Sequence, residues 1–150
     1  MHSELIECSM TSMFDHCLYF NTTALARVLE REWTDAFKPF GLTPPQAFML
    51  RVILEKPGSL QREVAKEMTI SRSTATRTLD GLQKLKLIER RTGEHDGREF
   101  EIHPTALALT LRDQIKAASV AVSKRLKKSL GVAQFDETVA IVIAVRKTLE

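Results

Sequence analysis

From residue 14 onward, apolar residues recur at the three- and four-residue spacing of amphipathic helices. The spacing predicts a long first helix that starts at Phe14 and ends near Pro39 and Gly41. Residues 47–55 are apolar on nearly every face, which predicts a buried central helix. Thr43-Pro44-Pro45-Gln46 precedes it and combines a cap, a proline at the first position and a capping box.

Two shorter helices are predicted in the middle of the chain. Ser59 is expected to cap the first, and Thr69-Ile70 forms the turn between them. Ser71 caps the second, which runs to about Lys86. Its inner face is expected to comprise Ala75, Leu79, Leu82 and Leu85, and its outer face Arg72, Ser73, Thr76, Arg77, Asp80 and Lys84.

A charged β-hairpin follows the second of these helices. Residues 87–91 and 99–103 read as strands, with Phe100 and Ile102 directed inward. Asp96-Gly97 lies in the loop between them. Helix, turn, helix and hairpin in this order predict a winged helix-turn-helix.

Two more helices are predicted after the hairpin, separated by Gly131. The apolar stripe of the first is Leu107, Leu111, Ile115, Ala118, Val122 and Leu126. In the second, residues 140–145 are apolar on every face, more than a small domain covers alone, which favours a homodimer interface.

The predicted fold is mainly α, with a small β-hairpin wing and long flanking helices. We expect a flexible segment at 1–11, a helical dimerisation region at 12–42 and 104–150, and a winged helix-turn-helix DNA-binding region at 43–103, all within one structural domain. Two DNA-reading helices in a symmetric dimer suit a pseudo-palindromic operator.

Composition excludes several classes of protein. The 150 residues carry a net charge of only +3, so the distribution of charge must indicate the partner. Two cysteines are too few for a disulfide framework. The sequence shows neither a signal peptide nor an apolar run long enough to span a bilayer. We therefore expect a cytoplasmic protein. We find no metal-ligand spacing, P-loop, nucleophile elbow or dinucleotide fingerprint, so we expect neither an enzyme nor a cofactor.

The start of the second short helix carries the chemistry expected of a DNA reader. Hydroxyl groups at a helix N-terminus suit phosphates, and arginine and threonine suit either base edges or phosphates. In the wing, Arg98 is expected to enter the minor groove, with Asp96 fixing its direction. The predicted DNA-contacting residues are Gln61, Ser71, Arg72, Ser73, Thr74, Thr76, Arg77, Arg91 and Arg98.

Two alternatives stay open. Cys17 on the first helix is a possible redox-responsive thiol, although a small, partly buried apolar side chain is the simpler interpretation. The winged helix is also compatible with a protein- or RNA-interaction module.

The chain from about Phe14 to Leu149 resembles the MarR family of bacterial transcription regulators. The matching pieces are Gly41-Leu42-Thr43-Pro44-Pro45-Gln46, Leu60-Gln61-Arg62-Glu63-Val64-Ala65, Ile70 to Arg77, the run from Leu82 to Arg90, and Asp96-x-Arg98. The resemblance implies a homodimeric regulator, more often a repressor. It also implies a pocket between the dimer helices and the DNA-binding lobe, where small apolar, phenolic or anionic ligands lower DNA affinity. Lys86 departs from the family, which usually has glycine there.

Overall fold

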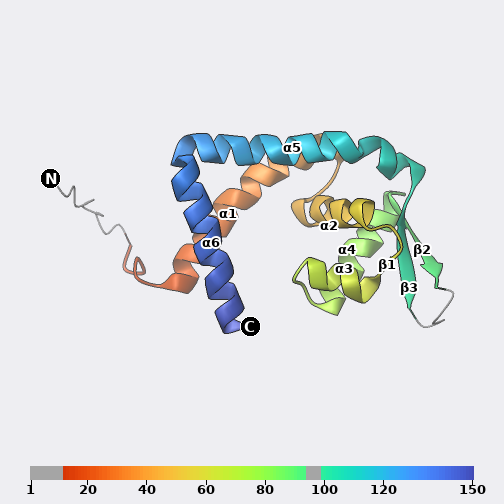
Figure 1. Ribbon diagram of the computed structural model, residues 1–150, viewed down its shortest axis with the longest axis horizontal. Coiled ribbons are helices and arrows are strands. Elements are labelled where there is room, and N and C mark those ends of the chain that lie inside the picture. The colour runs from red at the N-terminus through yellow and green to blue at the C-terminus, as the bar shows by residue number, and fades with distance from the viewer. Residues whose placement is uncertain (1–11, 94–98) are drawn as a thin grey trace.

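The structure, a computed structural model, describes residues 12–93 and 99–150 (Figure 1). The helices are α1 (Leu18–Phe37), a 3-10 turn η1 (Lys38–Phe40), α2 (Pro44–Glu55), α3 (Gln61–Glu67), α4 (Arg72–Lys84), α5 (Ala106–Leu130) and α6 (Val132–Leu149). The strands are β1 (Ser59–Leu60), β2 (Ile88–Thr92) and β3 (Phe100–Pro104). The mainly helical winged fold is confirmed.

Helix α1 begins four residues later than the apolar pattern predicts. Residues 13–16 form a turn, and Cys17 is the N-cap, with its Sγ accepting a hydrogen bond from the backbone N–H of Phe20 at 3.5 Å. At the other end the chain passes through η1 to Gly41, whose φ of 66° is a conformation that glycine adopts without a Cβ clash.

The central helix α2 is the core of the molecule. Its predicted capping box is present: Thr43 Oγ1 accepts from the N–H of Gln46 at 3.4 Å, and Gln46 Oε1 accepts from the N–H of Thr43 at 3.0 Å. Its buried side chains are Ala47, Met49, Leu50, Ile53 and Leu54. They pack against neighbours from α1, α3, α4, α5 and β3, so this helix joins the helix-turn-helix to the long helices α1 and α5.

The wing is a three-stranded antiparallel sheet in the order β1-β3-β2. The prediction that Ser59 caps a helix is wrong, because Ser59 pairs with Ile102 in β1. The cap of α3 is Leu60, whose N–H donates to Glu63 Oε2 at 2.9 Å. A two-residue strand is too short for an alternating pattern, so only its partner strand reveals it.

Three side chains predicted to face inward are exposed, namely Leu85 (42 %), Phe100 (46 %) and Leu107 (50 %). Phe100 and Ile102 share a face of β3, but Phe100 pairs with Thr92 at the far end of the hairpin, beyond the core. Leu85 and Leu107 lie at helix ends, where the chain turns away from the core.

Among the described residues, two other than glycine have a left-handed backbone. Thr69, between α3 and α4, has a φ of 54°, and Lys86, after α4, has a φ of 59°. A Cβ at such a position clashes with the following carbonyl oxygen. The departure at Lys86 therefore falls at a position whose geometry favours glycine.

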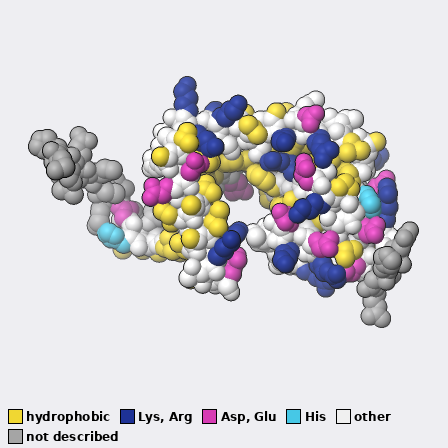
Figure 2. Space-filling model, in the orientation of Figure 1, with side chains coloured by type: hydrophobic (Ala, Val, Ile, Leu, Met, Phe, Trp, Pro, Cys, Tyr) yellow, Lys and Arg dark blue, Asp and Glu magenta, His cyan; other side chains and the backbone are white. Residues whose placement is uncertain are grey.

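Helix α5 runs from the wing past α2 to α6 and has α1 beside it, whereas α6 lies apart from the winged lobe (Figure 1). The break between α5 and α6 at Gly131 is confirmed, with a φ of 82°. No residue of α6 is buried, and Figure 2 shows hydrophobic side chains gathered along it. No helix in residues 12–93 and 99–150 has the length and apolar character to cross a membrane.

The left-handed backbone at Lys86 yields a stability prediction. We expect Lys86→Gly to raise the free energy of unfolding by about 0.5–1 kcal/mol, because removing the Cβ relieves more strain than the added flexibility of the unfolded chain costs. The control is Lys84→Gly, inside α4, which should lower it by about 1 kcal/mol. Urea unfolding measures both, and equal losses in the two variants would contradict the interpretation.

Candidate nucleic-acid interface

Helices α3 and α4 form a helix-turn-helix with a tightly bonded turn. The backbone N–H groups of Thr69 and Ile70 donate to the carbonyl oxygens of Lys66 and Ala65, both at 3.1 Å. The predicted cap of α4 is confirmed, since Ser71 Oγ accepts from the N–H of Thr74 at 3.2 Å. Burial of Ala75, Leu79 and Leu82 places the opposite face of α4 in solvent.

The predicted contact residues of α4 are all exposed: Ser71, Arg72, Ser73, Thr74, Thr76 and Arg77. Ser71 lies within hydrogen-bond distance of the hydroxyls of Ser73 (3.1 Å) and Thr74 (2.9 Å). Gln61, on the first turn of α3, donates to Thr76 Oγ1 at 2.7 Å and joins the two helices on this face. Arg77 has no carboxylate partner in the part of the chain that the structure describes.

The wing is fastened to the second half of α4 by Arg90. Its guanidinium contacts Asp80 Oδ1 at 2.8 Å and Gln83 Oε1 at 2.6 Å, and only 16 % of its side chain is exposed. The next residue, Arg91, is 57 % exposed and pairs with Glu89 at 3.0 Å. Arg90 therefore positions the strand, whereas Arg91 forms an exposed ion pair on the surface of the wing. Asp96 and Arg98 lie outside the described residues.

A second charged contact fastens the wing to the first turns of both helices. Glu99, just before β3, is 15 % exposed. Its Oε2 lies 2.7 Å from Arg62 Nη1 on α3, and its Oε1 lies 3.8 Å from Arg72 Nη2 on α4. Both arginine side chains are largely exposed, at 64 % and 79 %. Each oxygen of one carboxylate thus faces a different helix of the motif.

Sequence reasoning missed the roles of Arg62, Gln83, Arg90 and Glu99. Each of these residues looks like an ordinary charged or polar surface residue in the chain. Arg62 and Glu99 are 37 positions apart in the chain. A contact over that separation leaves no pattern among neighbouring residues of the sequence. The signal lies only in the fold, which brings the strand beside the two helices.

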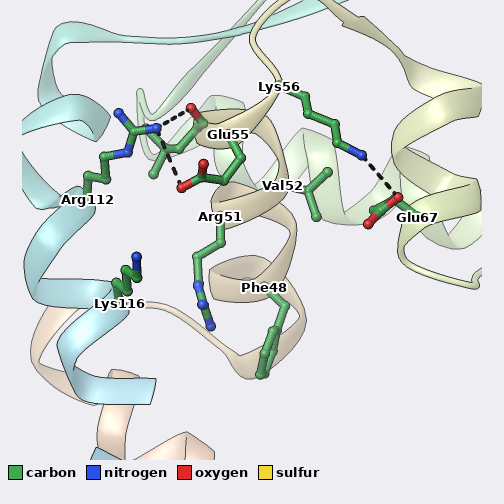
Figure 3. Close-up of a pocket in the computed structure, with 9 residues that line it drawn as sticks. Phe48, Arg51, Val52, Glu55, Lys56, Glu67, Arg112 and Lys116 are labelled. Atoms are coloured by element: carbon green, nitrogen blue, oxygen red, sulfur yellow. Dashed lines mark hydrogen bonds and ion pairs between the residues drawn. The ribbon is translucent and has the colours of Figure 1, made fainter. Parts of the chain in front are cut away.

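A cavity of about 580 Å³ lies between α2 and α5 (Figure 3). Phe48 and Val52 supply its apolar wall. Its charged lining comprises four cations, Arg51, Lys56, Arg112 and Lys116, and two carboxylates, Glu55 and Glu67. Both carboxylates are paired, Glu55 with Arg112 at 3.6 Å and Glu67 with Lys56 at 3.3 Å.

Arg51 links this cavity to the junction of three helices. It donates to Ser119 Oγ of α5 at 2.9 Å, and Trp33 Nε1 of α1 lies 3.4 Å from the same oxygen. Ser119 is 6 % exposed. The Arg51 guanidinium also lies over the ring of Phe48, at 5.8 Å from its centroid. Among the described residues, neither Arg51 nor Lys116 has a carboxylate partner.

The other predicted chemistry finds little support in the geometry. Cys17 is exposed and free, rather than the partly buried side chain that the simpler interpretation assumed. Its redox role stays a prediction. Within 12–93 and 99–150, His, Cys, Asp and Glu side chains form no cluster able to hold a metal ion.

The fold and this surface define a winged helix-turn-helix protein. A model described as MarR family matches residues 40–99. The HTH-type transcriptional regulator MgrA of Staphylococcus aureus is 28 % identical over 134 residues, which cover 81 % of this chain and 91 % of MgrA. The matched region spans α2, α3, α4 and β2, and there the chain is similar to regulators of the MarR family.

Solved structures share the fold at lower identity. The transcriptional repressor CouR bound to a 23-mer DNA duplex has a TM-score of 0.80 and 21 % identity, over 87 % of this chain and 93 % of CouR. The S. aureus MepR–DNA complex has a TM-score of 0.78 and 18 % identity, over 89 % of this chain and 98 % of MepR. The M. tuberculosis regulator MOSR in complex with DNA has a TM-score of 0.76 and 24 % identity, over 89 % of this chain and 98 % of MOSR.

Proposed function

We propose that the protein is a homodimeric transcription regulator, acting as a repressor, that binds a pseudo-palindromic double-stranded DNA operator and responds to a small ligand. The observation that carries the DNA-binding part is the exposed face of α4. Its first two turns present two arginines and several hydroxyls, and Arg90 and Glu99 hold the wing beside it. The match of residues 40–99 to the MarR family model and the DNA complexes of the similar structures support the same function.

The geometry supplies each part of such a contact. The N-terminus of α4 offers unpaired backbone N–H groups and hydroxyls to phosphates. Arg72, Thr76 and Arg77 lie on the exposed face that enters the major groove. Because phosphate contacts dominate affinity, binding weakens steeply as salt rises.

The first test removes both arginines of α4. We expect Arg72→Ala with Arg77→Ala to abolish operator binding at physiological salt. At low salt, any residual binding should show a salt dependence that is smaller by about two phosphate contacts. The operator is first recovered by footprinting of the adjacent intergenic DNA with the wild-type protein. Titration of a labelled duplex at several salt concentrations measures the effect.

A matched control removes the same charge elsewhere. Lys124→Ala with Lys128→Ala changes two exposed cations of α5 and should leave the affinity within about threefold, since no close contact is lost. Full operator binding by the double arginine variant would contradict the proposal.

The apolar surface of α6 supports the dimer. Within α6, the most exposed apolar side chains are Val132, Ile141, Val142 and Leu149, at 53–77 %. At the start of the described chain, Met13, Phe14, Leu18 and Tyr19 are also exposed. A continuous apolar surface of this kind is costly in water, and a second copy of the chain covers it with a matching surface.

The dimer proposal is tested by placing a charge on that surface. We expect Val142→Glu to weaken self-association about 100-fold or more, because the carboxylate is buried without a partner. Gln134→Glu adds the same charge to α6 without removing an apolar side chain and should have little effect. Sedimentation at several concentrations measures the mass, and a stable dimer of Val142→Glu, or a monomeric wild-type protein, would refute this interface.

The cavity between α2 and α5 supports the ligand. Its volume suits a small molecule, and Arg51 and Lys116 suit the anionic end of an aromatic ligand whose ring lies against Phe48 and Val52. An anion that bonds to Arg51 competes with Ser119 for that guanidinium. The ligand thereby weakens a contact between the DNA-binding lobe and α5, which shifts the population toward dimers with the wrong spacing of their α4 helices.

The ligand proposal is tested with benzoate and salicylate as probes. We expect both to release DNA from the wild-type protein and to bind Lys116→Met about tenfold more weakly. This variant keeps the contact between Arg51 and Ser119 and should still bind DNA. Lys56→Met is the control, because Lys56 lines the same cavity but is already paired with Glu67. Calorimetry and DNA release measure both effects, and equal weakening in the two variants, or none in Lys116→Met, would count against the proposal.

A further inference from the structure

Glu99 lies at a place where a carboxylate opposes the proposed function. A DNA-binding surface gains affinity from unpaired cations, because each one neutralises a phosphate and releases counterions. Glu99 instead brings a negative charge to the first turn of α4, beside Arg72. Its side chain is 85 % covered, so its position is set by packing and pairing rather than by solvent.

The two arginines hold this carboxylate unequally. Arg62 lies at 2.7 Å, a charge-assisted hydrogen bond, whereas Arg72 lies at 3.8 Å and is 79 % exposed. An exposed ion pair at that distance contributes little and exchanges readily for another anion. Arg72 is therefore the partner that an incoming phosphate can take, while Arg62 keeps Glu99 in place.

We propose that Glu99 is a specificity-determining residue that competes with DNA phosphates for Arg72. In the free protein, Glu99 partly neutralises Arg72 and lowers the attraction to any duplex. On the operator, base contacts from α4 align the phosphate that takes Arg72 from Glu99, so the lost ion pair is replaced. On unrelated DNA that alignment is absent, and Glu99 keeps affinity low. The inference rests on the proposed DNA-binding function.

The test is Glu99→Gln, which keeps the shape of the side chain and removes its charge. We expect affinity for a mixed-sequence duplex to rise about three- to tenfold. The decrease of this affinity with salt concentration should become steeper by the amount that about one phosphate contact adds. Affinity for the operator should change less, so the ratio of operator to mixed-sequence affinity falls. Both arginines are exposed, so this variant leaves no buried unpaired cation.

Two further comparisons separate charge competition from a structural role. Glu32→Gln removes a carboxylate that also pairs with an arginine, Arg125 at 3.5 Å, but far from α4, and should leave the ratio unchanged. In an Arg72→Gln background, Glu99→Gln should increase affinity for the mixed duplex much less than in the wild type. A merely structural Glu99 would show the same effect in both backgrounds.

A third comparison leaves Glu99 intact, so it holds even if Glu99→Gln fails to fold. Arg72→Gln should weaken mixed-sequence binding less than Arg77→Gln, because Arg72 is already partly neutralised. Equal losses, or reduced binding of Glu99→Gln to both duplexes, would overturn the role of Glu99. A wild-type protein that binds neither duplex would instead refute the proposed function itself.

Discussion

The burial of α2 is the interaction on which the other elements depend. Met49, Leu50 and Ile53 are fully buried, and their helix contacts α1, α3, α4, α5 and β3. Burying such side chains contributes roughly 1.5–3 kcal/mol each. The helix-turn-helix, the wing and the long helices are therefore held in one arrangement by a single apolar helix, and a shift of α2 relative to α5 moves the whole winged lobe.

Charged side chains add orientation to this apolar core. Arg90 ties the wing to the end of α4, Glu99 ties it to the beginning, and Arg51 ties α2 to Ser119 of α5. Each contact joins two elements that the core already brings together. Ion pairs and hydrogen bonds of this kind contribute little net free energy to folding. They therefore orient the elements that they join, and the polar groups of a ligand readily replace them.

Several features of the fold were predictable from local sequence patterns alone. The capping box of Thr43 and Gln46, the cap at Ser71, the buried face of α4 and the break at Gly131 all follow from neighbouring residues. Patterns failed at the ends of elements, as at Ser59, Leu85 and Phe100. At the end of an element, a side chain is buried only if another element of the fold extends far enough to cover it. The spacing of apolar residues along the chain does not indicate whether this happens.

The amino-acid sequence by itself determined the order of helices, the caps, the winged motif and the arginines of α4, because caps and amphipathic faces depend on residues within a few positions of each other. Only the tertiary structure decided which polar and charged side chains meet. Arg62 and Arg72 share Glu99, and Trp33 and Arg51 share Ser119, across long separations in the chain. Such pairs form because packing of the apolar core fixes where each backbone passes, and their own attraction is too weak to choose a partner.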